Sequence, residues 1–206
     1  MSVAHVRDEE FISTSRWGLG RSPISREGMM QLTKVDILKE IKSWGKCLVF
    51  AMVFSLLLTQ FIIVNAKVPT GSMQNSIMPN DRVVASRLSY IRSDPERFDI
   101  VVFRSPNDNR TLYVKRVIGL PGETVKIEAG RVFINGDPTP LYDSFVPTEP
   151  FEEYFEPVTV PEGSYYVLGD NRNYSADSRT WNNMFVPGDD ILGRVVFRYF
   201  PNISLF

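Results

Sequence analysis

The residue types of this chain point to hydrolysis by a serine that works without histidine. The sole histidine, His5, lies far upstream of a long apolar run. Ser72 lies within Val-Pro-Thr-Gly-Ser-Met (68–73), and Lys115 lies within Tyr-Val-Lys-Arg (113–116). A serine nucleophile needs a base that removes its proton, and this base is usually an imidazole. We therefore predict that Ser72 and Lys115 form the rarer Ser-Lys pair.

A lysine can act as a base only while its amine is neutral. The pKa of Lys115 must therefore fall from the ordinary value of about 10.4. Burial lowers the pKa of a lysine because loss of water penalises the charged form. The apolar neighbours Tyr113, Val114 and Val117 predict such burial. We expect Lys115 to be buried and poorly paired.

Composition limits the classes of protein that the chain can belong to. With 206 residues, 43% of them hydrophobic, it can hold one domain of about 150 residues and an appendage. The net charge of −1 divides into +2 over residues 1–46 and −3 over residues 47–206, which argues against nucleic acid as a partner. The single Cys47 excludes an intrachain disulfide and a multi-cysteine zinc site. The carboxylates of the sequence form no metal-binding motif, so we expect no metal and no cofactor.

An uncharged run of twenty residues, Cys47 to Ala66, is long enough to span a membrane. As a helix it would measure about 30 Å, the thickness of the hydrocarbon core. Thr33 with Asp36 three positions later is typical of a helix start. The sequence predicts one helix over residues 34–66 that follows a mobile tail, residues 1–33.

Basic residues indicate the orientation of this helix. Four precede the apolar run closely and two follow it: Lys34, Lys39, Lys42 and Lys46 before, Lys67 and Arg82 after. The bias predicts a single-pass protein of the cell membrane with a cytoplasmic N-terminus and an extracytoplasmic domain, residues 67–206. Two alternatives remain open. One is a cleavable signal sequence ending at Val64-Asn65-Ala66, although the run is longer than usual. The other is a buried helix of a soluble protein.

After residue 67 the chain changes to short β-type runs separated by turn residues. The predicted strands are 82–86, 100–104, 112–119, 124–128, 131–134, 164–168 and 191–199. They indicate a mostly β protein, with an antiparallel, curved β catalytic domain behind the membrane helix. Asn135-Gly136 is the strongest hairpin signal. The density of proline over residues 139–160 argues against a central strand and predicts a long surface excursion.

Four segments occur in a characteristic order behind the apolar helix: VPTGSM (68–73), FDIVVF (98–103), YVKRVIGLPGE (113–123) and GDNRNYSADSR (169–179). Together they resemble the bacterial type I signal peptidases, membrane-bound serine proteases that remove signal peptides from exported proteins. The resemblance covers roughly residues 34–206. It implies the same activity here, with no cofactor.

The resemblance also implies the roles of individual residues. Ser72 would be the acyl-forming nucleophile and Lys115 its general base. The hydroxyl of Thr70, together with the Ser72 N–H, would form the oxyanion hole. Many relatives carry serine at position 70, but threonine keeps the hydroxyl donor. Ser175 would orient Lys115.

Other residues of the last segment would support this arrangement. Asp177 and Arg179 match a pair that braces the turn. For Asp170 and Asn171 we favour a structural turn without catalysis. Asn173 and Tyr174 replace the more usual pair of the family, which leaves the shape of the loop open.

Substrate recognition is likewise implied by the resemblance. The enzyme would cleave after small-x-small motifs such as Ala-x-Ala, in a substrate that lies extended along residues 112–115 and 68–72. Two shallow pockets would accept the small side chains, one formed by Met73, Ile77 and Tyr113 and the other by Val68, Val102 and Val114.

The expected partners follow from the position of the nucleophile, six residues beyond Ala66. This short tether would hold Ser72 at the lipid bilayer, where preproteins with signal peptides arrive near the protein translocation channel. Trp181, Met184 and Phe185 are expected to contact lipid. Two competing hypotheses remain: a self-cleaving regulator of the Ser-Lys type, and an inactive membrane-anchored β scaffold that binds exported proteins.

Overall fold

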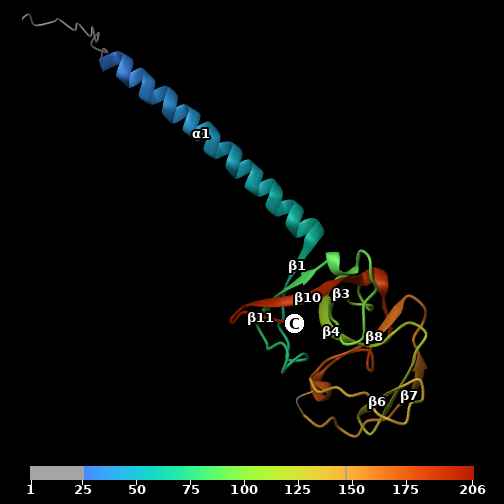
Figure 1. Ribbon diagram of the computed structural model, residues 1–206. Helices are drawn as coiled ribbons and strands as arrows, with labels where there is room; N and C mark the ends of the chain where they lie inside the picture. Colours follow the sequence, from blue (N-terminus) through green and yellow to red (C-terminus); the bar gives the residue numbers. More distant parts are fainter. Residues whose placement is uncertain (1–25, 147) are drawn as a thin grey trace, which may run out of the picture. The chain divides into compact units, whose positions relative to one another are not determined.

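The computed structural model describes residues 26–146 and 148–206, with side chains from residue 36 onward (Figure 1). The chain divides after Phe50 into two compact units, and the second contains all of the strands. The helical elements of the whole described chain are α1 (Arg26–Leu57), the π-helical segment η1 (Leu58–Ile62) and three 3-10 turns, η2 (Leu88–Tyr90), η3 (Arg172–Tyr174) and η4 (Gly188–Asp190). The strands are β1 (Ile63–Lys67), β2 (Arg82–Ser86), β3 (Ile100–Arg104), β4 (Leu112–Gly119), β5 (Thr124–Glu128), β6 (Arg131–Ile134), β7 (Phe155–Thr159), β8 (Ser164–Leu168), β9 (Val186–Pro187), β10 (Ile191–Phe200) and β11 (Ser204–Leu205).

The helical part of the chain is long and apolar enough to cross a membrane. Asp36–Ile62 contains a window with mean hydropathy 1.9, none of which is buried inside the protein. Its polar side chains can be satisfied within the helix, as the hydroxyl of Thr59 shows. This hydroxyl donates to the carbonyl oxygens of Ser55 (2.9 Å) and Leu56 (3.1 Å). Such internal hydrogen bonds suit a helix that is surrounded by hydrocarbon.

The helix differs from the predicted span of residues 34–66 at both ends. Residues 26–33 are already helical, so Thr33 does not mark the start. At the other end, residues 63–66 belong to β1, in which buried Val64 and Ala66 alternate with exposed residues. This period of two fits a half-buried strand, and the free edge of β2 provides the pairing partner. Of the predicted tail, residues 1–25 lie outside the described residues.

The strands form two antiparallel sheets. The larger sheet has eight strands in the order β1-β2-β10-β3-β4-β8-β9, with β11 pairing onto β10. The smaller has three, in the order β6-β5-β7. Strand β10 carries register shifts after Ile191, Val195 and Arg198, where extra residues bend a strand and increase its twist. The predicted mostly antiparallel β architecture is confirmed.

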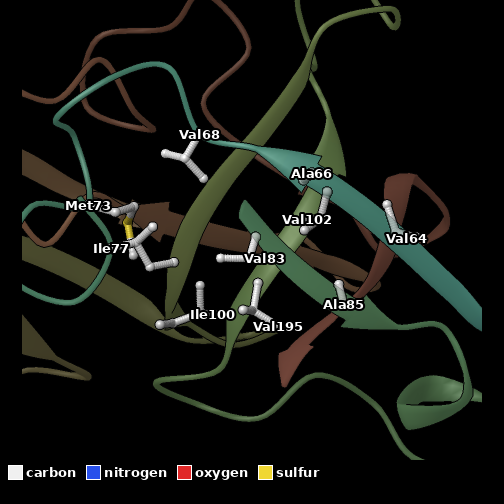
Figure 2. Close-up of a cluster of buried hydrophobic side chains, with 10 residues drawn as sticks. All are labelled: Val64, Ala66, Val68, Met73, Ile77, Val83, Ala85, Ile100, Val102 and Val195. Carbon is white, nitrogen blue, oxygen red and sulfur yellow. The ribbon is translucent and has the colours of Figure 1, made fainter. Parts of the chain in front are cut away.

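Opposite faces of β3 and β4 pack on two different apolar clusters. Figure 2 shows the first apolar cluster, formed by Val64, Ala66, Val68, Met73, Ile77, Val83, Ala85, Ile100, Val102 and Val195. On the other face of β3, Val101 and Phe103 belong to the second cluster, with Trp181. The ring of Trp181 stacks on that of Tyr113, with centroids 5.5 Å apart. The expectation that Trp181 contacts lipid is therefore wrong, because its ring is part of the core.

The predicted strands are confirmed, and most have the predicted bounds. The last one extends one residue further, to Phe200. Strands β1, β7, β9 and β11 were not predicted. Strand β7 lies in the proline-rich segment, at an edge of the smaller sheet, where proline is tolerated.

The hairpin turn of the smaller sheet lies at a different dipeptide from the one predicted. Asn135 and Gly136 do adopt positive φ values of 52° and 72°. The turn that joins β5 to β6, however, is Ala129-Gly130, with φ values of 50° and 75°. Two consecutive left-handed residues give the twist that such a two-residue connection requires. The Asn135-Gly136 signal therefore marked a turn, but this turn does not join two paired strands.

Candidate functional site

Ser72 lies on the loop that connects β1 to β2. The loop is closed by a hydrogen bond of 3.0 Å from the N–H of Val68 to the carbonyl of Asp81. Inside it, the N–H of Ile77 donates to the carbonyl of Met73 (2.8 Å), and both side chains are fully buried in the first apolar cluster (Figure 2). These contacts fix the backbone around Ser72, which is only 8% exposed.

Lys115 lies in the middle of β4 and is almost completely buried, at 3% exposure. It pairs in register with Val101 of β3, so its side chain shares a face with that buried residue. The amine donates a hydrogen bond of 3.1 Å to the hydroxyl of Ser175. Burial lowers the pKa of Lys115 to about 8, an effect that nearby Asp177 partly opposes. At mildly alkaline pH a substantial fraction of this amine is neutral.

A loop after β8, residues 169–179, carries Ser175. The fully buried carboxylate of Asp177 holds this loop by accepting from the N–H of Gly169 (3.0 Å) and the Nε of Arg179 (2.8 Å). Arg179 also donates to the carbonyl oxygen of Arg172 (2.6 Å) and to Glu153. Asp177 and Arg179 therefore tie both ends of the loop together.

Gly169 is the point at which the loop of Ser72 and the loop of Ser175 meet. A methyl group at this position would lie well under 3.0 Å from both the hydroxyl of Ser175 and the carbonyl oxygen of Ser72. The carbonyl of Ser72 also accepts a hydrogen bond from the N–H of Asn171 (3.0 Å). The side-chain amide of Asn171 donates to the carbonyl of Gly71 (3.1 Å). Asn171 of the second loop thus holds the carbonyl groups of both Gly71 and Ser72.

The hydroxyl of Ser72 lies 3.3 Å from that of Thr70. Within residues 26–146 and 148–206, no hydrogen bond joins Ser72 directly to Lys115, and the N–H of Ser72 donates none. The structure therefore has two adjacent pairs, Thr70 with Ser72 and Lys115 with Ser175. The unused N–H of Ser72 and the hydroxyl of Thr70 are two donors at the nucleophile, the arrangement that an oxyanion requires.

The residue after Lys115 forms a buried ion pair that was not predicted. Arg116 donates to both carboxylate oxygens of Asp170, at 2.8 and 2.6 Å, and to the carbonyl of Phe98 (2.8 Å). Its guanidinium also lies over the ring of Phe145, 4.0 Å from the centroid. Asp170 is 0% exposed and accepts a further hydrogen bond from Ser76. Asp170 thus has the satisfied, structural environment that we favoured for it.

The six residues assigned to substrate pockets divide between two clusters. Val68, Met73, Ile77 and Val102 belong to the first apolar cluster, and Val114 packs against it. Tyr113 does not join them, because it packs against the second cluster on the opposite face of β4. Neighbouring residues of a strand point to opposite faces, so Tyr113 and Val114 cannot serve the same wall. This separates Tyr113 from Met73 and Ile77, with which it was grouped.

No group of three or more histidine, cysteine, aspartate or glutamate side chains in the described part of the chain could hold a metal ion. His5 lies outside the described residues. Ser72 contacts the hydroxyl of Thr70 and the N–H of Asn171, and the amine of Lys115 contacts the hydroxyl of Ser175, groups that are suited to proton transfer and acyl chemistry.

Comparisons with known proteins agree on one family. The family model for signal peptidase, peptidase S26, matches residues 41–200. A probable signal peptidase I-2 from Synechocystis sp. is 39% identical over 163 residues, which cover 76% of this chain and 72% of the relative. A signal peptidase I from Leptolyngbya laminosa is 38% identical, with 80% of each chain covered. Signal peptidase I P from Bacillus subtilis subsp. natto is 32% identical, covering 82% of this chain and 96% of its own. The chain therefore belongs to the signal peptidases of family S26, serine proteases of the type I signal peptidase kind.

Proposed function

We propose that this protein removes N-terminal signal peptides from exported preproteins through an acyl-enzyme on Ser72, with Lys115 as the general base. One observation carries the proposal: the amine of Lys115 is buried and its pKa is lowered to about 8. Among the described residues, Lys115 forms no ion pair that would hold it in the charged form. A neutral amine next to the loop of a serine nucleophile can act as a base.

The chemistry would proceed in two steps. In the first, Lys115 takes the proton of the Ser72 hydroxyl while the oxygen attacks the scissile carbonyl, and the proton then passes to the leaving amine. The hydroxyl of Thr70 and the N–H of Ser72 stabilise the oxyanion. In the second step, Lys115 takes a proton from a water that attacks the ester and passes it to the Ser72 oxygen as the carboxyl product leaves, which restores the hydroxyl and the neutral amine. Catalytic hydrogen bonds are often long without substrate and tighten on binding, so we expect the amine to approach Ser72 in the complex.

The first apolar cluster supports cleavage after small side chains. Val68, Met73 and Ile77 belong to the loop that carries Ser72 and are almost completely buried, and Val114 packs against their cluster. Because these side chains are already packed against one another, they leave no space at this place for a large substrate side chain. The substrate would lie extended along β4 and residues 68–72 and add a strand there. An Ala-x-Ala motif, whose alternate side chains point the same way, suits this arrangement.

The apolar helix would anchor the enzyme in the cell membrane with the N-terminus in the cytoplasm and the β domain outside. The lysines before the apolar run favour this orientation. Labelling tests it, because a Cys47→Ser protein has no other cysteine. In that background a cysteine at the exposed position Tyr142 should react with a membrane-impermeant maleimide in intact cells. Labelling only after lysis would reverse the orientation.

The central experiment uses the full chain in detergent micelles or lipid vesicles, with a preprotein that carries an Ala-x-Ala site. We expect the wild type to release the mature protein, and Ser72→Ala and Lys115→Ala to release none. Lys115→Arg should also be inactive, because a guanidinium stays charged. The matched control is Lys126→Ala, which removes an exposed lysine on β5.

Each outcome separates the hypotheses. Cleavage that survives Ser72→Ala would reject the proposal. Shortening of the enzyme itself without any preprotein would favour the self-cleaving regulator. A wild type that binds the preprotein but never cleaves it would favour the scaffold.

A further inference from the structure

A cavity of about 360 Å³ opens beside the nucleophile loop. It is lined by Gln74, Asn75, Met78, Thr148, Asn171 and Tyr174. None of these side chains carries a formal charge, so the walls consist of amides, a hydroxyl, a thioether and a phenol. Tyr174, at 75% exposure, and Met78 present apolar surface that the core does not use. Concave sites with apolar walls and a few polar groups are typical of ligand binding.

The cavity adjoins the residues of the nucleophile loop that flank the Ser72 hydroxyl. Asn171 binds the carbonyls of both Gly71 and Ser72. Gln74 lies over Gly71, since a methyl group there would lie 3.2 Å from the Gln74 side-chain oxygen. Two of the six lining residues therefore contact the Gly71-Ser72 dipeptide, which places the cavity next to the nucleophile.

The far wall is held in place by the proline-rich segment. The side-chain amide of Asn75 donates to the carbonyl of Phe145 (3.1 Å), three residues before Thr148. The ring of Phe151 packs edge-on against that of Tyr174, with centroids 6.3 Å apart. The N–H of Phe151 also donates to the side-chain oxygen of Asn173 (2.8 Å). These contacts join Phe145 to the nucleophile loop and Phe151 to the loop that carries Ser175.

From this geometry we propose that the cavity binds the first residues of the mature protein, those just beyond the scissile bond. The inference rests on the proposed function, in which the first apolar cluster binds the signal-peptide side of the same bond. None of the residues of that cluster lines the cavity. A preprotein bound at Ser72 would thus contact the first apolar cluster with its signal-peptide half and the cavity with its mature half. The uncharged walls select uncharged side chains, because a charged one would lose water without gaining a partner.

Double-mutant cycles between enzyme and substrate test the assignment in the full-length enzyme in micelles. The enzyme variant is Tyr174→Ala, and the substrate is a preprotein with leucine or glycine at each of the first three positions after the bond. At one or more of these positions, we expect Tyr174→Ala to lower kcat/KM about fivefold for the leucine substrate. For the glycine substrate at the same position, the loss of kcat/KM should be much smaller. The same exchange three residues before the bond should show no coupling with Tyr174.

Further variants separate a contact from a general disturbance of the neighbouring Ser175. A displaced Ser175 would lower kcat for all substrates equally and give no coupling. Met78→Ala, on a different wall, should show the same pattern as Tyr174→Ala. Tyr174→Phe, which keeps the ring, should behave like the wild type. Tyr154→Ala, an exposed tyrosine that does not line the cavity, is the control.

The result that overturns the assignment is an absence of coupling after the bond, or equal coupling before it. Failure of the proposed function looks different, since cleavage would then survive Ser72→Ala or never occur.

Discussion

The amine of Lys115 and the hydroxyl of Ser175 lie 3.1 Å apart although sixty positions separate them in the chain. This contact fixes the end of a flexible side chain that must reach the nucleophile. Ser175→Ala should lower kcat about tenfold to a hundredfold with little change in KM, because the base is no longer oriented. Steady-state kinetics check this. Ser175→Thr, which keeps the hydroxyl, should recover part of the activity. A change in KM alone would contradict an orienting role.

The pH dependence of cleavage should report the buried amine. Because the reaction needs neutral Lys115, kcat/KM should rise with pH and level off above an inflection near 8, where the pKa of Lys115 lies. An ordinary, hydrated lysine would give a rate that still rises near pH 10. A profile of kcat/KM from pH 6 to 10 distinguishes the two, provided that the protein remains folded across the range.

Stability should depend on the same group with a defined sign. The pKa of Lys115 is about 8 in the folded protein and returns to the ordinary 10.5 on unfolding, so the unfolded chain binds more protons between these values. Stability should therefore rise with pH between about 8 and 10.5. Lys115→Met, which removes the buried charge, should stabilise the protein by roughly 3 kcal/mol at pH 7 and by less as the pH rises through that window. Denaturant unfolding at pH 7 and pH 10 measures the difference, and a gain equal at both would contradict it.

Thr70 is predicted to supply one of the two oxyanion donors. Thr70→Ala should lower kcat roughly a hundredfold to a thousandfold and leave the fold intact. Thr70→Ser should retain most activity, because it keeps the hydroxyl that lies 3.3 Å from that of Ser72. Unchanged turnover in Thr70→Ala, with an unfolding curve like that of the wild type, would remove Thr70 from the site.

The buried ion pair between Arg116 and Asp170 should contribute far more to stability than an exposed pair. Asp170→Ala leaves a buried guanidinium without its carboxylate and should cost about 3–5 kcal/mol of unfolding free energy. Glu128→Ala breaks the exposed pair with Lys126 and should change stability by less than about 1 kcal/mol. Urea titrations of the two variants test the contrast. Similar losses would mean that burial does not set the strength of these pairs.

Most of the domain could be predicted because its strands carry local signals. Residues 100–104 and 112–119 are rich in β-branched and aromatic residues and lie between turn residues, and both form strands with those bounds. The missed strands lack such signals. Strand β1 continues an apolar run without a break, so only the presence of β2 beside it decides between helix and strand. The two-residue β9 carries no period at all.

The candidate site could be predicted only where one residue determines the chemistry. Ser72 and Lys115 were chosen as candidates because a serine without histidine needs another base. Arg116 was missed because its partner Asp170 lies more than fifty positions away, and adjacent basic residues in a strand are usually exposed. The cluster against which Tyr113 packs could not be predicted, because it depends on which face of β4 meets which cluster. Such tertiary choices leave no trace in a local pattern.

The position of β1 at the edge of the larger sheet determines where the enzyme can be shortened. An engineer who removes everything up to Ala66, the expected end of the helix, would delete four of the five residues of this edge strand and uncover the hydrogen-bonding groups of β2. Val64 and Ala66 would be lost from the first apolar cluster, next to the loop that carries the nucleophile. A water-soluble catalytic fragment should instead begin no later than Ile63, so that solubility is gained without opening the sheet to aggregation.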